Sequence, residues 1–498
     1  MTSPATVTDL RPRRPSAAVV LLRGHGESLE TYWVLRSDAV RYMPEFRAFP
    51  GGTADADDAS IDIEGIQPGT ERTARACAIR EVFEETGVLL AESDVDEPTR
   101  NAARDRLLEG RATFAELVRE HGWRFHAEAL VPAGRWVSPA FAATRFETEF
   151  FLTRLTHAQE PHIRPGELAS GEWISPLTAL RRWQAGAETF AAPVLYTMIA
   201  LGQGEEDLPR RLTEWPEASG KPVRRIELKW GIVLHPMKTR PLPPATHSNT
   251  YLVGDREMAL IDPGSGDEAE LQRLFDLIEM LGTDQRKVQV VLLTHHHPDH
   301  VAGVEAVRQR YGVKVGAHPE TAKHVRVDFS IDDGQWIPLV YSQDDWNLRA
   351  IHTPGHTRGH LCFYHPRTRS LFSGDHVVGG VGTVIIDPPE GDMADYVRSL
   401  ERLAKLGAET LFPGHGAPQG AVARRLRHLL EHRLEREAKV VAALDREPRT
   451  LQALIERVYV DTPRELWPYA ERSLLAHLLK LEAEGRARRE SDFWKGVG

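Results

Sequence analysis

The sequence predicts a multidomain protein of the α/β and α+β class, and three observations carry that prediction. Its 498 residues correspond to about three domains. Short apolar runs, most of them followed closely by Gly, Pro or Asp, alternate with helical segments over most of the chain. After Gly420 the pattern becomes mostly helical. We therefore expect domains at 16–202, 223–420 and 421–498, with a polar, proline-bearing linker at 203–222.

Strands and helices can be assigned to the first two domains from their sequence patterns. In the first block, 17–23, 32–36 and 148–154 have the pattern of strands and 73–85 that of a helix. In the second block, strands are expected at 251–253, 258–261, 288–293, 349–352, 370–373 and 409–412, and helices at 268–281 and 394–406. This order predicts sheets covered by helices, with the chemistry on loops at strand ends.

The composition is that of an ordinary globular protein, 41% hydrophobic and 27% charged. No apolar run approaches the roughly 20 residues of a membrane helix, and no signal-type segment follows the N-terminus. Cys77 and Cys362 are far apart and form no disulfide framework, which favours a reducing compartment. A net charge of −10 argues against sequence-independent binding of duplex DNA. We expect a cytoplasmic enzyme with no membrane partner; its oligomeric state is left open.

A helix rich in glutamate is the first chemical feature. Glu81, Glu84 and Glu85 are spaced i, i+3 and i+4, so their carboxylates share one helix face. Like charges so placed destabilise an isolated helix, and a hard cation such as Mg²⁺ or Mn²⁺ would relieve the repulsion. A plain surface helix is the common alternative for such a pattern. The upstream run 49–52 and the helix stop at Gly87 favour the metal interpretation.

A histidine-rich loop at 295–300 is the second feature, and it follows the apolar run 290–293 directly. Imidazole and carboxylate are the ligands that zinc prefers, and their alternation lets one loop reach two metals. Further ligand candidates, each preceded by an apolar run and a glycine, are His356, Asp375 and His415. A solvated histidine loop is the alternative, but spacing and downstream partners favour a metal site. His296 and His376 are out of ligand register.

With these motifs, residues 223–418 resemble the metallo-β-lactamase superfamily. The resemblance implies two metal ions, with zinc favoured and iron or manganese fitting the same ligand set, and a hydroxide nucleophile that attacks an ester, thioester or phosphodiester. The implied ligands of the first metal are His295, His297 and His356; those of the second are Asp299, His300 and His415; Asp375 bridges them, and Asp299 also counts as catalytic. Asp262 would orient a ligand histidine, with a plain turn residue as the alternative, and His360 would contact substrate or be a core histidine.

Residues 16–200 are similar to the Nudix hydrolases, which cut diphosphates linked to another group. By that likeness Glu81, Glu84 and Glu85 hold Mg²⁺ or Mn²⁺, and Glu81 and Glu84 are the catalytic pair. Arg80 would orient the carboxylates through a salt bridge, and Gly52 would allow a tight loop. The motif departs from the usual box because the gap between Gly52 and Arg80 is much longer, which leaves Glu71 one residue out of register. A box lengthened in this way is similar to the subgroup that acts on coenzyme A and acyl-CoA.

The C-terminal block has apolar residues at three- and four-residue spacing between 450 and 481, then Gly485 and a basic turn, as in a small winged helix. It resembles the β-lactamase-like protein 2 branch, whose animal member is a single-strand endoribonuclease. Two functions are therefore expected. The first is a bifunctional hydrolase of thioesters or esters and of diphosphates such as CoA derivatives; the alternative is RNA processing with single-stranded RNA as partner. A decayed binding module is disfavoured because every ligand position is filled.

Overall fold

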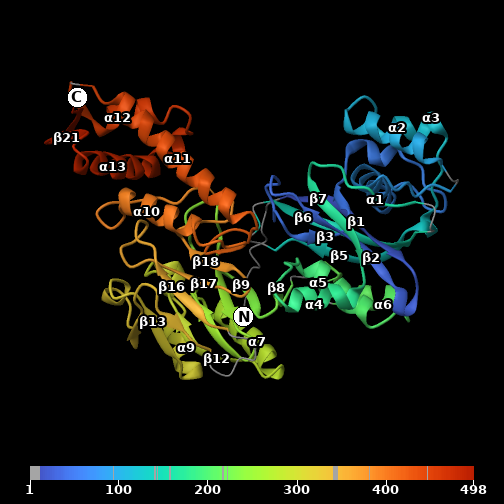
Figure 1. Ribbon diagram of the computed structural model, residues 1–498, viewed down its shortest axis with the longest axis horizontal. Coiled ribbons are helices and arrows are strands. Elements are labelled where there is room, and N and C mark those ends of the chain that lie inside the picture. Colours follow the sequence, from blue (N-terminus) through green and yellow to red (C-terminus); the bar gives the residue numbers. More distant parts are fainter. Residues whose placement is uncertain are drawn as a thin grey trace, which may run out of the picture. The chain divides into compact units, whose positions relative to one another are not determined.

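The computed structural model describes residues 12–92, 95–139, 142, 144–155, 159–215, 218–220, 223–339, 346–380, 382–445 and 447–497. The N-terminal stretch 1–11, from which we inferred the lack of a signal segment, lies outside them. The chain forms two compact units, Met1–Trp230 and Gly231–Gly498 (Figure 1).

A mixed sheet forms the centre of the first unit, with the strand order β3-β2-β1-β6-β5, β4 on β1 and β7 on β2. Its central strand β1 runs antiparallel to β2 and parallel to β6. The strands are β1 (Arg13–Arg23), β2 (Glu30–Arg36), β3 (Arg47–Ala48), β4 (Gly51–Thr53), β5 (Val131–Val137), β6 (Arg145–Arg154) and β7 (Leu168–Ile174).

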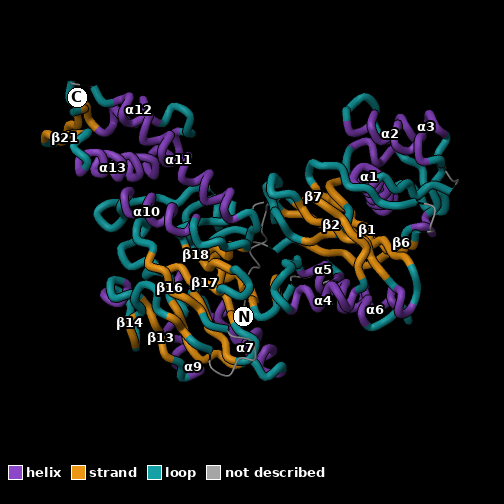
Figure 2. The backbone as a smooth tube through the Cα atoms, in the orientation of Figure 1, coloured by secondary structure: helices purple, strands orange, loops and turns teal. Residues whose placement is uncertain are grey.

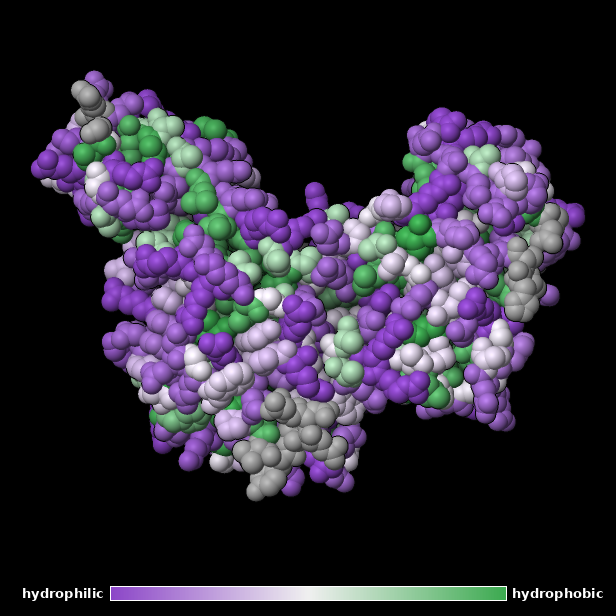
Figure 3. All heavy atoms as spheres, viewed as in Figure 1, coloured by the Kyte–Doolittle hydropathy of each residue, from purple (hydrophilic) through white to green (hydrophobic). Residues whose placement is uncertain are grey.

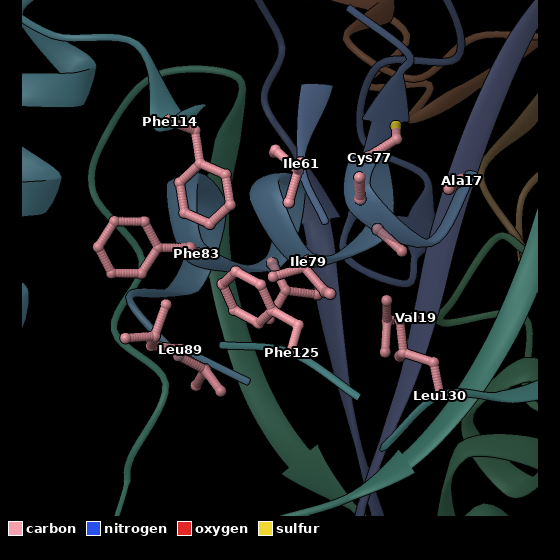
Figure 4. Close-up of a cluster of buried hydrophobic side chains, with 14 of the residues drawn as sticks. Ala17, Val19, Ile61, Cys77, Ile79, Phe83, Leu89, Phe114, Phe125 and Leu130 are labelled. Atoms are coloured by element: carbon pink, nitrogen blue, oxygen red, sulfur yellow. The ribbon is translucent and has the colours of Figure 1, made fainter. Parts of the chain in front are cut away.

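Helices cover both faces of this sheet (Figures 1 and 2). Side chains alternate along β1, so Val19 and Leu21 face one core while Val20 and Leu22 face the other. Figure 4 shows the first core, where Phe83 packs on Phe114 with ring centroids 5.7 Å apart. The first face carries α1 (Thr70–Thr86), α2 (Glu97–Leu108) and α3 (Phe114–His121); the second carries α4 (Pro176–Gln184), α5 (Ala192–Gly202) and α6 (Leu208–Glu214).

The stretch 203–222, expected to be a linker, contains α6. Leu208 and Leu212 are buried in the second core of the first unit because the helix presents them to β5 and α5. The unit boundary falls after Trp230. The chain around α6 is therefore part of a packed layer, and the positions of the domain boundaries stay predictions.

Two sheets face each other in the second unit. One has the order β14-β13-β12-β11-β10-β9-β8 and the other β15-β16-β17-β18-β19. Tyr251 joins them, with its ring 5.3 Å from Phe372 and 5.6 Å from Phe412. The strands of the first sheet that belong to this unit are β9 (Ile232–Lys238), β10 (His247–Val253), β11 (Glu257–Ile261), β12 (Lys287–Leu292), β13 (Lys314–Ala317) and β14 (Phe329–Ser330). Its end strand β8 (Ile226–Lys229) precedes the boundary at Trp230. The second consists of β15 (Trp336–Ile337), β16 (Leu348–His352), β17 (Leu361–His365), β18 (Ser370–Gly374) and β19 (Thr410–Pro413).

The outer faces of these sheets are covered by helices, which completes a four-layer αβ/βα sandwich. Apolar residues of α7 (Glu268–Thr283) and α9 (Val304–Tyr311) pack on the first sheet. Those of α10 (Met393–Ala404) and the long α11 (Val422–Ala443) pack on the second. The strands and helices predicted for this block are confirmed, with small differences at their ends.

The C-terminal part combines helices with a small sheet of order β20-β22-β21, the arrangement of a winged helix. Its core joins Val440 of α11, Leu454 of α12, Leu474 of α13 and Trp494 of β22. The elements are β20 (Arg449–Thr450), α12 (Leu451–Val458), α13 (Trp467–Ala483), β21 (Ala487–Glu490) and β22 (Phe493–Gly496). The predicted multidomain fold class is confirmed.

Most side chains on the visible face are hydrophilic, with smaller apolar areas between them (Figure 3). Among the described residues, no helix combines the length and the apolar character that a membrane span requires.

Candidate metal centres

The predicted ligands of the second unit gather at the ends of neighbouring strands. The 295–300 loop follows β12 and includes the short helix α8 (Pro298–Val301). His356, Asp375 and His415 follow β16, β18 and β19, which run in the same direction. The carboxyl ends of these strands meet at one edge, so ligands far apart in the sequence converge.

Three histidines form the first set. His297 Nδ1 lies 3.0 Å from His295 Nε2 and 3.1 Å from His356 Nε2. In the second set, His415 Nε2 lies 3.3 Å from both His300 Nε2 and Asp299 Oδ2. A tetrahedral zinc with bonds of about 2.0–2.1 Å separates its ligand atoms by roughly 3.3 Å. Both sets therefore fit one such ion each.

Asp375 lies between the two sets. Its Oδ1 is 3.4 Å from His300 Nε2 and 3.3 Å from His415 Nε2, while its Oδ2 is 3.9 Å from His356 Nε2. A Cβ atom at Gly414 would come within 2.6 Å of Asp375 Oδ1, so this position requires glycine. The arrangement suits a carboxylate shared by two ions.

In four of the predicted ligand histidines, the ring nitrogen that faces away from the site contacts an oxygen atom. When this nitrogen is protonated and donates to the oxygen, the nitrogen facing the site keeps its lone pair for a metal. The pairs are His295 Nδ1 with Thr294 Oγ1 at 3.0 Å, His300 Nδ1 with Asp262 Oδ2 at 2.9 Å, His356 Nδ1 with the Ile385 carbonyl at 3.0 Å, and His415 Nδ1 with the His247 carbonyl at 2.8 Å.

Asp262 is buried and has a left-handed backbone, with φ of 50°. Its carboxylate accepts hydrogen bonds from the backbone N–H of Thr294 at 2.8 Å and from its hydroxyl at 2.5 Å. Together with the contact to His300, these bonds use both carboxylate oxygens. The side chain thus braces the start of the histidine loop, which favours the orienting interpretation over that of a plain turn residue.

The two sets differ in charge. Burial, and then the neighbouring His356, lower the pKa of His297 to about 3, so this imidazole is neutral at pH 7. Burial acts in the same direction on His415, but Asp375 and Asp299 outweigh it and raise the pKa of His415 to about 10. Burial opposes the ionisation of Asp299, yet His415 and His300 lower its pKa to about 2. The carboxylates therefore attract positive charge to this half of the site.

In the first unit, Arg80 of the glutamate helix α1 contacts several carboxylates at once. Its Nη1 donates to Glu81 Oε1 at 2.9 Å and to Glu84 Oε2 at 3.2 Å. Its Nε and Nη2 donate to the two oxygens of Asp58 at 2.8 and 2.9 Å, and Nη2 also donates to the Thr53 carbonyl. Arg80 thus holds Glu81 and Glu84, two of the three predicted ligands, in place.

The loop of β4 lies directly against the same helix. The Gly51 N–H donates to Glu85 Oε2 at 2.8 Å, and a Cβ atom at Gly52 would meet the Glu81 carboxylate at 2.5 Å. Burial, opposed by Arg80 and reinforced by Glu84, raises the pKa of Glu81 to about 7, and burial with Glu81 raises that of Glu85. Buried carboxylates so placed favour the arrival of a cation.

The carboxylate oxygens of the three glutamates lie farther apart than the ligand atoms of the histidine site. In the part of the chain that the structure describes, Glu81, Glu84 and Glu85 do not bring one oxygen each within 4.8 Å of one another. Mg²⁺ keeps several water ligands and binds through few carboxylates, so an open set suits it.

Comparison with known proteins identifies the family that each part of the chain resembles. Residues 243–415 match the family model of the metallo-beta-lactamase superfamily, residues 450–495 that of the beta-lactamase associated winged helix domain, and residues 64–201 that of the NUDT19 Nudix domain. The beta-lactamase-like protein 2 homolog of Drosophila melanogaster is 31% identical over 261 residues, which cover 48% of this chain and 84% of that protein. The chain belongs to the metallo-β-lactamase superfamily.

Two further relatives come from different classes. The atrochrysone carboxyl ACP thioesterase of Aspergillus fumigatus is 32% identical over 214 residues, 41% of this chain and 62% of that protein. A Nudix hydrolase crystal structure from Alicyclobacillus acidocaldarius covers 42% of this chain and 100% of its own, with 26% identity and a TM-score of 0.37. With metallo-β-lactamase and Nudix domains, which belong to metal-dependent families, the chain is a hydrolase.

The structure also locates two histidines near the metallo-β-lactamase site whose roles the sequence left open. His360 is fully buried, with Nδ1 2.9 Å from Thr353 Oγ1, so its burial favours a core histidine over a substrate contact. His296 Nε2 lies 3.3 Å from Glu390 Oε1, and its ring stacks on His324 with centroids 4.1 Å apart. With Glu390 and His297 it forms a further group of possible ligand atoms, beside the three-histidine set.

Sequence reasoning missed Asp58, which is completely buried on η2 (Ala56–Ser60) of the Nudix domain. The acidic run 55–64 in the lengthened box was the signal that could have indicated it. Glu71, the candidate nearest the expected register, instead pairs with Arg75 at 2.9 Å and has 64% of its side chain exposed. The carbonyls of Ile385 and His247 were also missed, because no residue type marks a backbone contact.

Proposed function

We propose that this chain is a bifunctional metal-dependent hydrolase of coenzyme A species. The metallo-β-lactamase site would cleave an acyl thioester, and the Nudix site would cleave the diphosphate of the CoA moiety. The observation that carries the proposal is the pair of ligand sets joined by Asp375, together with a separate carboxylate helix in the other unit. The thioester is favoured by the similarity to an ACP thioesterase, and the diphosphate by the Nudix match.

Two zinc ions at the histidine site would activate water at neutral pH and polarise the bond under attack. The contribution of the chain is orientation: Asp262, Thr294 and the carbonyls of Ile385 and His247 fix the rings that face the site. Asp299, which accepts a hydrogen bond from Ser248 Oγ at 3.4 Å, would align the attacking water. Hydrolysis there would break the C–S bond and form a C–O bond to the water oxygen, giving a carboxylate, a free thiol and a proton.

At the Nudix site, Mg²⁺ or Mn²⁺ would bind Glu81, Glu84 and Glu85. Glu84 is more exposed than Glu81, with 26% against 12% of the side chain, so it is better placed to meet water and substrate. Arg80 would keep both carboxylates aimed at the ion. Water attack on the CoA diphosphate releases 4′-phosphopantetheine and the adenosine bisphosphate.

The first experiment follows CoA cleavage by the full chain with Mg²⁺ or Mn²⁺, detecting 4′-phosphopantetheine by mass spectrometry. We expect turnover that Glu84→Gln abolishes and that Glu71→Gln, on the same helix but ion-paired at the surface, leaves unchanged. Absence of product with either metal contradicts the Nudix half of the proposal.

The second experiment separates the two sites with acyl-CoA and the zinc-loaded chain in the presence of Mg²⁺, measuring free thiol and diphosphate cleavage together. Asp299→Asn should abolish thiol release and keep diphosphate cleavage, while Glu84→Gln should do the reverse. Thiol release that is equal in the wild type and in Asp299→Asn excludes the thioesterase assignment.

A second candidate function, single-strand RNA cleavage, is favoured by the winged-helix domain. Its strand β21 carries Arg488 and Arg489, and Arg488 has 67% of its side chain exposed, as a phosphate contact requires. Single-stranded RNA incubated with the zinc-loaded wild type and with Asp299→Asn decides between the substrates. Cleavage by the wild type alone supports RNA, whereas equal cleavage by both indicates a contaminating nuclease.

A further inference from the structure

The 382–390 loop precedes α10 and contacts two segments that carry predicted metal ligands. The Ile385 carbonyl lies 3.0 Å from His356 Nδ1, and the Pro389 carbonyl accepts a hydrogen bond from Arg358 at 2.9 Å. Glu390 pairs with His296 at 3.3 Å. The position of the loop therefore sets the orientation of the His356 ring, whose Nε2 faces the three-histidine set.

The opposite side of this loop is held by arginines from the C-terminal helices. Arg433 of α11 donates a hydrogen bond from Nη2 to the carbonyl of Val384, the residue before Ile385. Arg472 of α13 donates from Nη1 to Asp387 Oδ2 at 2.7 Å. Both ends of the short stretch 384–387 are thus tied to elements beyond the ligand-bearing loops.

The Arg433 contact is buried. The residue is 3% exposed, its guanidinium lies over the ring of Tyr396 at 5.1 Å, and its Nε has no hydrogen-bond partner among the described residues. Breaking a hydrogen bond of a buried cation is unfavourable, because no water replaces the lost partner. The Val384 carbonyl therefore cannot move away from Arg433 without leaving a poorly satisfied charge, and this restricts its neighbour Ile385.

We propose that Arg433 and Arg472 are positioning residues of the metallo-β-lactamase site. They hold the 382–390 loop so that the Ile385 carbonyl keeps His356 in its metal-binding orientation. The inference rests on the two-metal site of the proposed function and concerns its three-histidine half. It makes α11 and α13 part of the support of the metal centre.

The test is a Co²⁺ titration of the full-length protein, followed by visible absorption, which reports ligand geometry without any substrate. Arg433→Met should weaken Co²⁺ binding at the three-histidine half by about 10–100-fold and change its spectrum, as removal of an outer hydrogen bond does. The half formed by Asp299, His300 and His415 should keep its affinity. Arg472→Ala should cause a smaller loss of a few-fold, which Arg472→Asp combined with Asp387→Arg restores.

The matched control is Arg457→Ala, which removes another exposed winged-helix arginine, 3.5 Å from Asp445, and should leave both Co²⁺ steps unchanged. A folded Arg433→Met protein that binds Co²⁺ as the wild type does overturns the inference. If that variant fails to fold, Arg472→Ala decides, and unchanged binding there overturns it. A wild type that binds Co²⁺ but hydrolyses neither thioester nor RNA contradicts the proposed function alone.

Discussion

Arg80 and Asp58 form a buried, two-pronged ion pair beside the glutamate helix. Arg80 Nε lies 2.8 Å from Asp58 Oδ1 and Nη2 lies 2.9 Å from Oδ2, while Asp58 itself is completely buried. The same guanidinium donates to Glu81 and Glu84. The carboxylate that anchors Arg80 therefore comes from the lengthened loop and not from the helix.

Loss of Asp58 should both destabilise the first unit and impair the Nudix site. Asp58→Ala leaves a buried guanidinium without its main partner, which costs about 3–5 kcal/mol of unfolding free energy. Denaturant unfolding and CoA cleavage measure the two effects. The control Glu71→Gln removes an exposed pair worth about 0–1 kcal/mol and should keep activity. Equal effects of the two substitutions would contradict the anchoring role of Asp58.

Gly52→Ala should reduce diphosphate cleavage at least tenfold, a loss of about 1.4 kcal/mol of transition-state stabilisation. Its new Cβ would lie 2.5 Å from the Glu81 carboxylate, so the side chain must leave its place beside Arg80. Gly166→Ala is the control, because nothing lies within 4 Å of a Cβ there. Mg²⁺-dependent rates of both variants check the prediction, and full activity of Gly52→Ala contradicts it.

Asp262→Asn should weaken zinc binding about 10–100-fold, because the hydrogen bond that orients His300 is weakened and Thr294 loses its anchor. Zinc retained after competition with a chelator measures the loss. Asp267→Ala provides the control: it removes the N-cap of α7, at about 1 kcal/mol, without touching the site. Zinc retention in Asp262→Asn equal to that of the wild type would return Asp262 to a simple turn residue.

The stability of the C-terminal helices should fall at acidic pH. Burial works to raise the pKa of Glu437, but His477 and Lys480 outweigh it and lower this pKa to about 2. An unfolded glutamate titrates near 4.3, so the stabilisation is present above about pH 4.3 and is lost as the pH falls toward 2. Thermal unfolding between pH 6 and pH 3 should show this slope. Glu437→Gln should flatten it, whereas Glu484→Gln, whose side chain is 39% exposed, should have little effect.

The sequence by itself was enough to predict the two ligand sets, because each predicted ligand lies in a short local motif. Glu81, Glu84 and Glu85 share a helix face through the period of the α-helix. The histidine loop and the Gly-ligand steps at Asp375 and His415 are likewise set by a strand end and a glycine next to it. The domain classes could be predicted for the same reason, since each is marked by local motifs.

Only the tertiary structure decided which groups contact and orient these predicted ligands. Asp58 reaches Arg80, Ile385 reaches His356 and Arg433 reaches Val384 because packing joins segments whose separation follows no sequence period. Two of these three contacts use backbone carbonyls, which every residue carries and no motif records. Ligand identity is therefore a property of local sequence, whereas ligand orientation is a property of the packed fold.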